Sequence, residues 1–300
     1  MTNNTKGLLY AATAGFLWGI LAVVIKIVLN YIPPKTIAWS RFIIAFVLLF
    51  ISMLFYNPKS LKIFFKPPWL VIVSAISIGF NYIFFMEGIN ITTPNNAAIF
   101  IQAGPILLAI IGFVFYKEKL KWVHIIGLLI AFSGFIFFYH DQMHNLFQNN
   151  VIYNKGVFYI VLAGIFWTVY SVIQKELIKK YTAEELNLIN FGLPVLILLP
   201  GAEFRYFFEV PWFALLILLF LGVNTLLAYR CLSMALKYTE ANKVSVILTA
   251  NPTLTFLAMA VLTGLNVSWI TGEVFSVYSL MGAFLVISGA IIVSIFKGKN

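Results

Sequence analysis

Ten apolar stretches, each long enough to form a helix that crosses a membrane, dominate this sequence. A helix needs about 20 mostly apolar residues to cross the hydrocarbon core of a bilayer. The candidate stretches are residues 8–30, 35–56, 69–90, 94–116, 122–139, 155–178, 186–203, 211–236, 241–264 and 277–296. Only 10% of the residues are charged, whereas about 25% is usual in a soluble domain. Since each stretch is too long for a barrel strand and does not alternate, the sequence predicts an all-α integral membrane protein.

Lysine and arginine lie mostly between these stretches, and their distribution predicts the orientation. With the N-terminus in the cytoplasm, the cytoplasmic segments hold fourteen of these residues, whereas the outer segments hold only Lys35, Lys155 and Arg205. This bias agrees with the positive-inside rule. It predicts a multi-pass protein of the cytoplasmic membrane with both termini in the cytoplasm. The net charge of +10 forms no basic face, so we expect a lipid bilayer, and no nucleic acid, as a partner.

A segment of the first apolar stretch recurs in the sixth. Residues 7–26 and 156–175 are identical at seven of twenty positions, among them Trp18/Trp167. Further matches at offsets of 147 and 155 extend the repeat over both halves. Because five spans is an odd number, the second copy must enter the membrane from the opposite side. The sequence therefore predicts ten transmembrane helices in two inverted five-helix repeats.

The predicted halves are residues 1–145 and 146–300, with the polar stretch 139–155 as the linker between them. Three pairs of glycines recur in the two halves, and we expect them to be points of close helix packing. They are Gly15/Gly164, Gly127/Gly282 and Gly134/Gly289.

Several short motifs follow one another in the same order in both halves. In the first half they are Trp18-Gly19, Lys26, Arg41, Gln102-Ala103-Gly104-Pro105, Glu118, Gly127 and Ser133-Gly134, and in the second half Trp167, Asn251-Pro252, Gly282 and Ser288-Gly289. This order resembles the drug/metabolite transporter superfamily in its ten-helix form with two EamA-type halves. The resemblance implies transport of a substrate through a central cavity and leaves the substrate open. The second half departs from the pattern, because Asn190 stands opposite Arg41 and Leu265 stands opposite Glu118.

Charged residues within the spans need a role, because a charge in the bilayer is costly. Lys26 would either extend to the interface or place a positive charge at the mouth of the cavity. Arg41 is expected mainly to link helices by hydrogen bonds. Glu87 could take up a coupling proton or bind a substrate amine, or it could have a partner near the outer rim. Arg230 could hold a carboxylate, which makes Lys26, Glu87 and Arg230 candidates for gating or coupling.

Aromatic and amide side chains in the spans form the candidate substrate site. Two-fold related rings that face one cavity could bind a flat or cationic solute, although packing alone could also explain them. Amides near a proline could face a wet cavity or join helices by hydrogen bonds. The candidates are Trp18, Asn81, Tyr82, Gln102, Trp167, Tyr170, Asn224, Tyr229 and Asn251.

We expect a secondary active transporter, with export favoured, of small metabolites such as amino acids or amines. Alternating access would operate at a central cavity between the first, third, fourth, sixth, eighth and ninth helices. One alternative is an exchanger of anionic metabolites such as sugar phosphates, with Lys26, Arg41 and Arg230 as the anion site. A membrane-embedded lipid enzyme or a non-transporting scaffold are alternatives of other classes.

An enzyme is not expected, because no residue cluster has the spacing of a metal site and no catalytic motif is present. No cofactor is expected either. The sequence leaves open the substrate, the direction, the coupling ion and the choice between monomer and homodimer.

Overall fold

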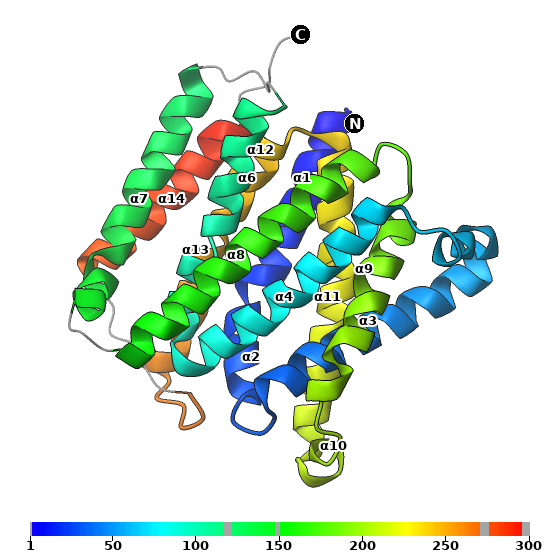
Figure 1. The fold of residues 1–300 in the computed structure, drawn as a ribbon. Coiled ribbons are helices and arrows are strands. Elements are labelled where there is room, and N and C mark those ends of the chain that lie inside the picture. The colour runs from blue at the N-terminus through cyan, green and yellow to red at the C-terminus, as the bar shows by residue number, and fades with distance from the viewer. Residues whose placement is uncertain (1, 117–121, 148–150, 271–275, 296–300) are drawn as a thin grey trace.

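The structure is a computed structural model that describes residues 2–116, 122–147, 151–270 and 276–295. Within these ranges all regular structure is helical (Figure 1). The helices are α1 (Asn3–Gly19), α2 (Leu21–Val28), α3 (Pro34–Tyr56), α4 (Trp69–Ile91), α5 (Pro94–Phe100), α6 (Ala103–Val114), α7 (Trp122–Phe147), α8 (Val151–Leu177), α9 (Ala183–Leu198), α10 (Tyr206–Glu209), α11 (Trp212–Tyr238), α12 (Ala241–Leu248), α13 (Asn251–Gly264) and α14 (Val277–Ile295), with the 3-10 helices η1 (Pro58–Phe64) and η2 (Leu199–Gly201).

Eight helical stretches in the described parts are long and apolar enough to cross a membrane. They are Asn3–Val28, Pro34–Tyr56, Trp69–Ile91, Pro94–Val114, Asn154–Leu177, Ala183–Gly201, Trp212–Tyr238 and Ala241–Gly264. Helices α7 and α14 lie at the places expected for the fifth and tenth spans. The predicted class, an all-α integral membrane protein, is confirmed.

Three of these stretches are each made of two helices. Asn3–Val28 is interrupted at Ile20, Pro94–Val114 at Ile101–Gln102 and Ala241–Gly264 at Thr249–Ala250. The last two interruptions come just before Pro105 and Pro252, where the ring removes a hydrogen-bond donor and opens the helix. The break at Ile20 has no proline near it and was not predicted.

The stretch 139–155 differs from a simple polar linker. Helix α7 continues to Phe147 and α8 begins at Val151, so most of this stretch extends the two neighbouring helices. Glu118, named above, lies outside the described residues. So do five of the fourteen cytoplasmic residues counted above: Lys117, Lys119, Lys121, Lys297 and Lys299.

Glycines set the closest helix contacts. Helices α7 and α14 lie side by side at one edge of the molecule (Figure 1). A Cβ at Gly134 would lie 2.6 Å from the Val286 nitrogen, and one at Gly289 would collide with the Gly127 carbonyl. A Cβ at Gly164 would lie 2.9 Å from the Gly104 nitrogen. The prediction that these glycines are packing points is confirmed.

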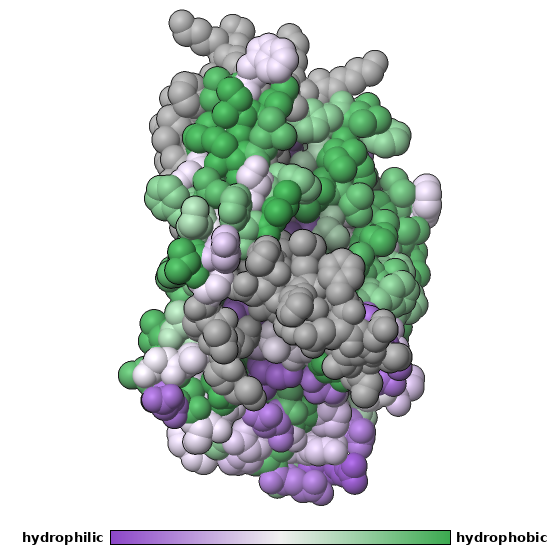
Figure 2. All heavy atoms as spheres, turned by 90° about the vertical axis from the view of Figure 1, so that its left-hand side faces the viewer, coloured by the Kyte–Doolittle hydropathy of each residue, from purple (hydrophilic) through white to green (hydrophobic). Residues whose placement is uncertain are grey.

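The outer surface is largely apolar, as a surface in contact with lipid must be. Figure 2 shows apolar side chains over much of one side of the molecule, with hydrophilic ones gathered at its lower end. Three tryptophans, Trp69, Trp122 and Trp212, each begin a helix and are 71%, 80% and 73% exposed. Exposed tryptophans at helix ends are typical of the interface between membrane and water.

Candidate functional site

The three helix breaks surround a central cavity of about 90 Å³. This volume has room for several water molecules. The lining residues come from both halves of the chain: Trp18, Leu21, Ala22, Arg41, Asn81, Tyr82, Phe85, Ala98, Ile101, Gln102, Pro105, Trp167, Tyr229, Leu248, Asn251 and Thr255. Interrupted helices expose unpaired backbone groups, which a membrane protein tolerates beside a cavity.

Side chains next to the breaks bind the carbonyls of neighbouring helices. The Thr255 hydroxyl donates to the Gly19 carbonyl oxygen at 2.5 Å. With its amide assigned by hydrogen bonding, Asn251 donates to the Gly15 carbonyl at 2.9 Å and to the Leu248 carbonyl at 3.1 Å. The bonds to Gly19 and Gly15 join α13 to α1 where both adjoin the cavity, and the bond to Leu248 joins α13 to α12.

Aromatic rings from the two halves meet at the cavity. The rings of Trp18 and Trp167 lie 6.1 Å apart at 81°, and those of Trp18 and Tyr229 lie 5.2 Å apart at 68°. Tyr82 and Tyr229 are 6.1 Å apart. Trp18 packs edge to face on both of its neighbours, a favourable geometry for aromatic pairs. The rings therefore form one connected wall of the cavity.

Of the described residues that line the cavity, Arg41 is the one that carries a charge. Its side chain is 2% exposed. Its Nε donates to the Thr225 hydroxyl at 3.1 Å, and its Nη2 donates to the Tyr82 hydroxyl at 3.2 Å. The guanidinium carbon also lies 4.4 Å from the centre of the Tyr82 ring. These bonds link α3, α4 and α11, which is the structural role expected of Arg41.

Two cavity amides each donate a hydrogen bond to a backbone carbonyl. The Asn81 amide nitrogen donates to the Ala163 carbonyl at 2.8 Å. The Gln102 amide nitrogen donates to the Ala98 carbonyl at 3.0 Å. The Gln102 Oε1 atom is buried and accepts no hydrogen bond from the described residues. Gln102 thus offers an acceptor at the helix break.

Tyr170 and Asn224, two of the expected site residues, do not line the cavity. Tyr170 is fully buried behind Tyr229, with the ring centres 5.4 Å apart, and its hydroxyl reaches Asn187 Oδ1 at 3.5 Å. Asn224 donates to the Leu17 carbonyl at 2.9 Å. The other seven expected residues do line it: Trp18, Asn81, Tyr82, Gln102, Trp167, Tyr229 and Asn251.

The three charged candidates also lie away from the cavity. Lys26 Nζ donates to the carbonyls of Ile89, Asn90 and Thr92 at 3.0, 3.0 and 2.7 Å, at the end of α4. Glu87 is half-buried on the last turns of α4.

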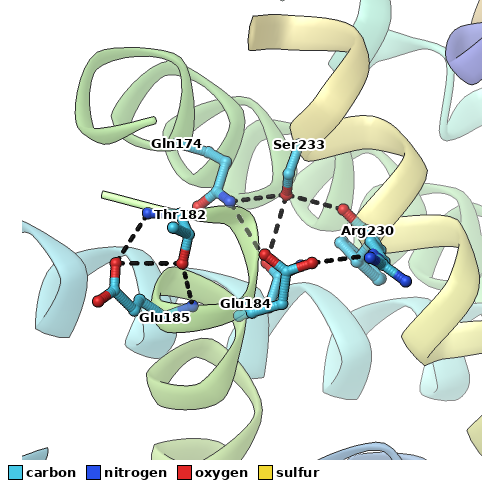
Figure 3. A network of polar contacts seen from close by, with 8 residues as sticks. Gln174, Thr182, Glu184, Glu185, Arg230 and Ser233 are labelled. Atoms are coloured by element: carbon cyan, nitrogen blue, oxygen red, sulfur yellow. Dashed lines mark hydrogen bonds and ion pairs between the residues drawn. The ribbon is translucent and has the colours of Figure 1, made fainter. Parts of the chain in front are cut away.

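Arg230 is exposed and pairs with a carboxylate of the protein itself. Its side chain is 59% exposed, and its Nε lies 3.0 Å from Glu184 Oε1 at the start of α9. Figure 3 shows this pair beside a buried network in which Gln174 donates to Ser233 at 2.7 Å. The network joins α8, α9 and α11 outside the cavity.

Sequence reasoning gave Arg41 mainly a structural role, with membership of an anion site as the alternative, and did not name Thr255 or Phe85. Arg41 had a usable signal, because it is a lone charge two turns inside a span. Thr255 and Phe85 had no such signal in a chain with 17% aromatic residues. Thr255 and Phe85 line the cavity because of how the helices pack in three dimensions.

Comparison with known proteins gives matches over nearly the whole chain. The model of the EamA-like transporter family matches residues 5–139 and 154–295. The chain is 28% identical over 287 residues to the "Uncharacterized inner membrane transporter YhbE" of Escherichia coli (strain K12), covering 95% of this chain and 89% of that protein. It is 29% identical over 292 residues to an "Uncharacterized transporter" of Haemophilus influenzae, covering 96% and 94%.

The fold is also similar to a solved one. A structure described as "Crystal structure of protein" superimposes with a TM-score of 0.75, at 20% identity and with 97% of each chain covered. At this identity the likeness concerns the fold alone.

Proposed function

Since the chain belongs to the EamA-like transporter family and is a multi-pass membrane transporter, we propose that it is a secondary active carrier of small metabolites, such as amino acids, which it exports. The sequence has no ATP-binding motif, so the energy would come from a gradient. Substrate would bind in the central cavity.

The observation that carries this proposal is the meeting of three interrupted helices at one cavity. Carriers built from inverted repeats bind their substrates where discontinuous helices meet between the repeats. Here the lining residues come from residues 1–145, such as Trp18, and from residues 146–300, such as Trp167. Rocking of these two halves would expose the cavity to each side in turn.

The aromatic wall favours an organic solute with an apolar part. Trp18, Trp167 and Tyr229 provide ring surface, and Asn251 and Gln102 provide amides next to it. Cavities of this kind, mostly apolar with a few polar groups, are typical of small-molecule sites. The anion exchanger keeps only one of its three expected cations, because Lys26 and Arg230 lie elsewhere.

Flux through proteoliposomes tests the proposal. Vesicles that contain the purified protein should exchange radiolabelled amino acids faster than vesicles without it. Replacing Trp18 and Trp167 together by alanine should lower the flux by about tenfold or more, since aromatic contacts contribute about 1 kcal/mol or more each. Trp212→Ala, at an exposed helix start, is the matched control. Equal flux in all variants would remove the cavity from the mechanism.

A further inference from the structure

The guanidinium of Arg41 has hydrogen-bonding capacity that the described part of the chain does not use. An arginine side chain has five N–H donors. Two of its nitrogens have partners, the hydroxyls of Thr225 and Tyr82. Both partners are neutral, and among the described residues no carboxylate lies within ion-pair distance of Arg41. The remaining donors belong to a side chain that lines the cavity.

Within the described ranges, no carboxylate acts as a counterion for this guanidinium. None of the described residues that line the cavity is an aspartate or a glutamate. A buried cation is strongly disfavoured unless it is paired with a negative charge. The neutral ring of Tyr82, 4.4 Å from the guanidinium carbon, compensates it only in part. The cavity as a whole therefore has a net positive charge that a ligand can neutralise.

The same cavity holds an acceptor without a donor. Gln102 is 3% exposed, and its Oε1 atom has no hydrogen-bond partner in the described part of the chain. A buried acceptor that lacks a partner is unfavourable, and an N–H group of a ligand would satisfy it. Arg41 and Gln102 thus offer a site for an anion and a site for a donor.

We propose that the substrate carries a carboxylate, which binds Arg41, and an N–H donor, which binds Gln102, with its apolar part against the aromatic wall. This inference rests on the proposed function and specifies its substrate class. A carboxylate fits better than a phosphate, because one guanidinium balances one negative charge and phosphate monoesters carry nearly two at neutral pH. Amines that lack an acid group would be poor substrates.

Three related ligands test the inference with the wild-type protein in detergent. They are L-phenylalanine, 2-phenylethylamine, which lacks the carboxylate, and 3-phenylpropanoate, which lacks the amine. Leucine, its amine and its acid, made by the same two deletions, and glycerol phosphate complete the panel. Binding is measured by thermal unfolding and by tryptophan fluorescence. We expect the amino acids to bind best, the acids next and the amines at least about tenfold more weakly than the amino acids, as for loss of a charged hydrogen bond. Tightest binding of an amine or of glycerol phosphate, or no binding by any acid, would overturn the assignment.

Variants identify the residue responsible. Arg41→Met should weaken binding of the amino acids and acids by about tenfold or more and leave the amines unchanged, whereas Arg41→Lys should retain part of the affinity. Arg205→Met, which removes an exposed arginine paired with Glu203, is the matched control. Acid binding by Arg41→Met at wild-type strength would contradict the proposal. If Arg41→Met does not fold, the comparison of ligands on the wild-type protein still decides.

Failure of this inference differs from failure of the proposed function. Flux of solutes with no preference for a carboxylate would overturn the inference and leave the carrier intact. Binding that selects carboxylates without any flux would support the inference about Arg41 and overturn the proposed carrier function.

Discussion

At the scale of single residues, two repeat-related lysines bind the ends of two helices. Lys26 donates to three carbonyls at the end of α4, and Lys175 donates to the Thr239 carbonyl at 3.2 Å, just after α11. A cation at a helix C-terminus interacts favourably with the unpaired carbonyls and with the helix dipole. The sequence showed that Lys26 lies near a span end, but it could not show which helix ends beside it.

Replacement of Lys26 tests this role. Lys26→Met should lower the free energy of unfolding by about 1–3 kcal/mol, because three carbonyls lose a charged donor, and should leave ligand selectivity unchanged. Thermal unfolding in detergent and the ligand panel above measure the two effects. Lys180→Met, at an exposed lysine, is the control. Altered selectivity with unchanged stability would place Lys26 in the transport path instead.

At the scale of helices, periodicity and composition predicted most of the fold. The expected span 69–90 is α4 (Trp69–Ile91), and the expected span 211–236 is α11 (Trp212–Tyr238). The break at Ile20 was missed because its cause is tertiary: the Gly19 carbonyl accepts from Thr255 of α13. At the equivalent place in α8, Thr168 bonds the Gly164 carbonyl one turn earlier, and the helix continues.

The site could be predicted only in part, for a related reason. Repeat symmetry identified Trp18, Trp167 and Tyr229, which do meet. Tyr170 lies about one turn after Trp167 on α8, and one turn along the helix is enough to move a side chain from the cavity to a packed interior. Which carbonyl takes up an amide, as Leu17 does for Asn224, depends on helix pairing that one sequence does not specify.

The contact between α7 and α14 gives a prediction at this scale. A Cβ at Gly134 would lie 2.6 Å from the Val286 nitrogen and 2.7 Å from the Gly282 oxygen. Gly134→Ala should therefore destabilise the protein by about 1–3 kcal/mol through overpacking. Gly264→Ala is the matched control, since a methyl group there would meet nothing within 4 Å. Thermal unfolding of both variants decides, and equal stability would mean that the two helices separate without cost.

At the scale of the whole molecule, the positions of lysine and arginine predict how the protein lies in the membrane. Both termini should be cytoplasmic, with Lys59, Lys62 and Lys66 on the same side and Lys35 and Arg205 outside. The family match in two successive parts, residues 5–139 and 154–295, fits a repeat of five spans. An odd number of spans in each half requires opposite orientations.

Reporters at the two chain ends test this arrangement. A split fluorescent protein whose larger part is expressed in the cytoplasm should become fluorescent with its small part fused to either end. Cysteine replacing Arg205, in a background without Cys231, should react with an impermeant thiol reagent added to intact cells. Fluorescence from one terminus alone would require an odd total number of spans and would rule out two equal halves.

The unpaired charge of Arg41 has a consequence for the effect of membrane voltage. Arginine stays protonated in proteins, so an empty cavity carries a positive charge. A zwitterionic amino acid adds one carboxylate and one ammonium and leaves this net charge unchanged, whereas an acid without an amine cancels it. One elementary charge moved through 100 mV corresponds to about 2.3 kcal/mol. Under the proposed mechanism, voltage would act alike on the empty carrier and on the carrier loaded with an amino acid. The loaded step would be almost electrically silent only with an acid that lacks the amine.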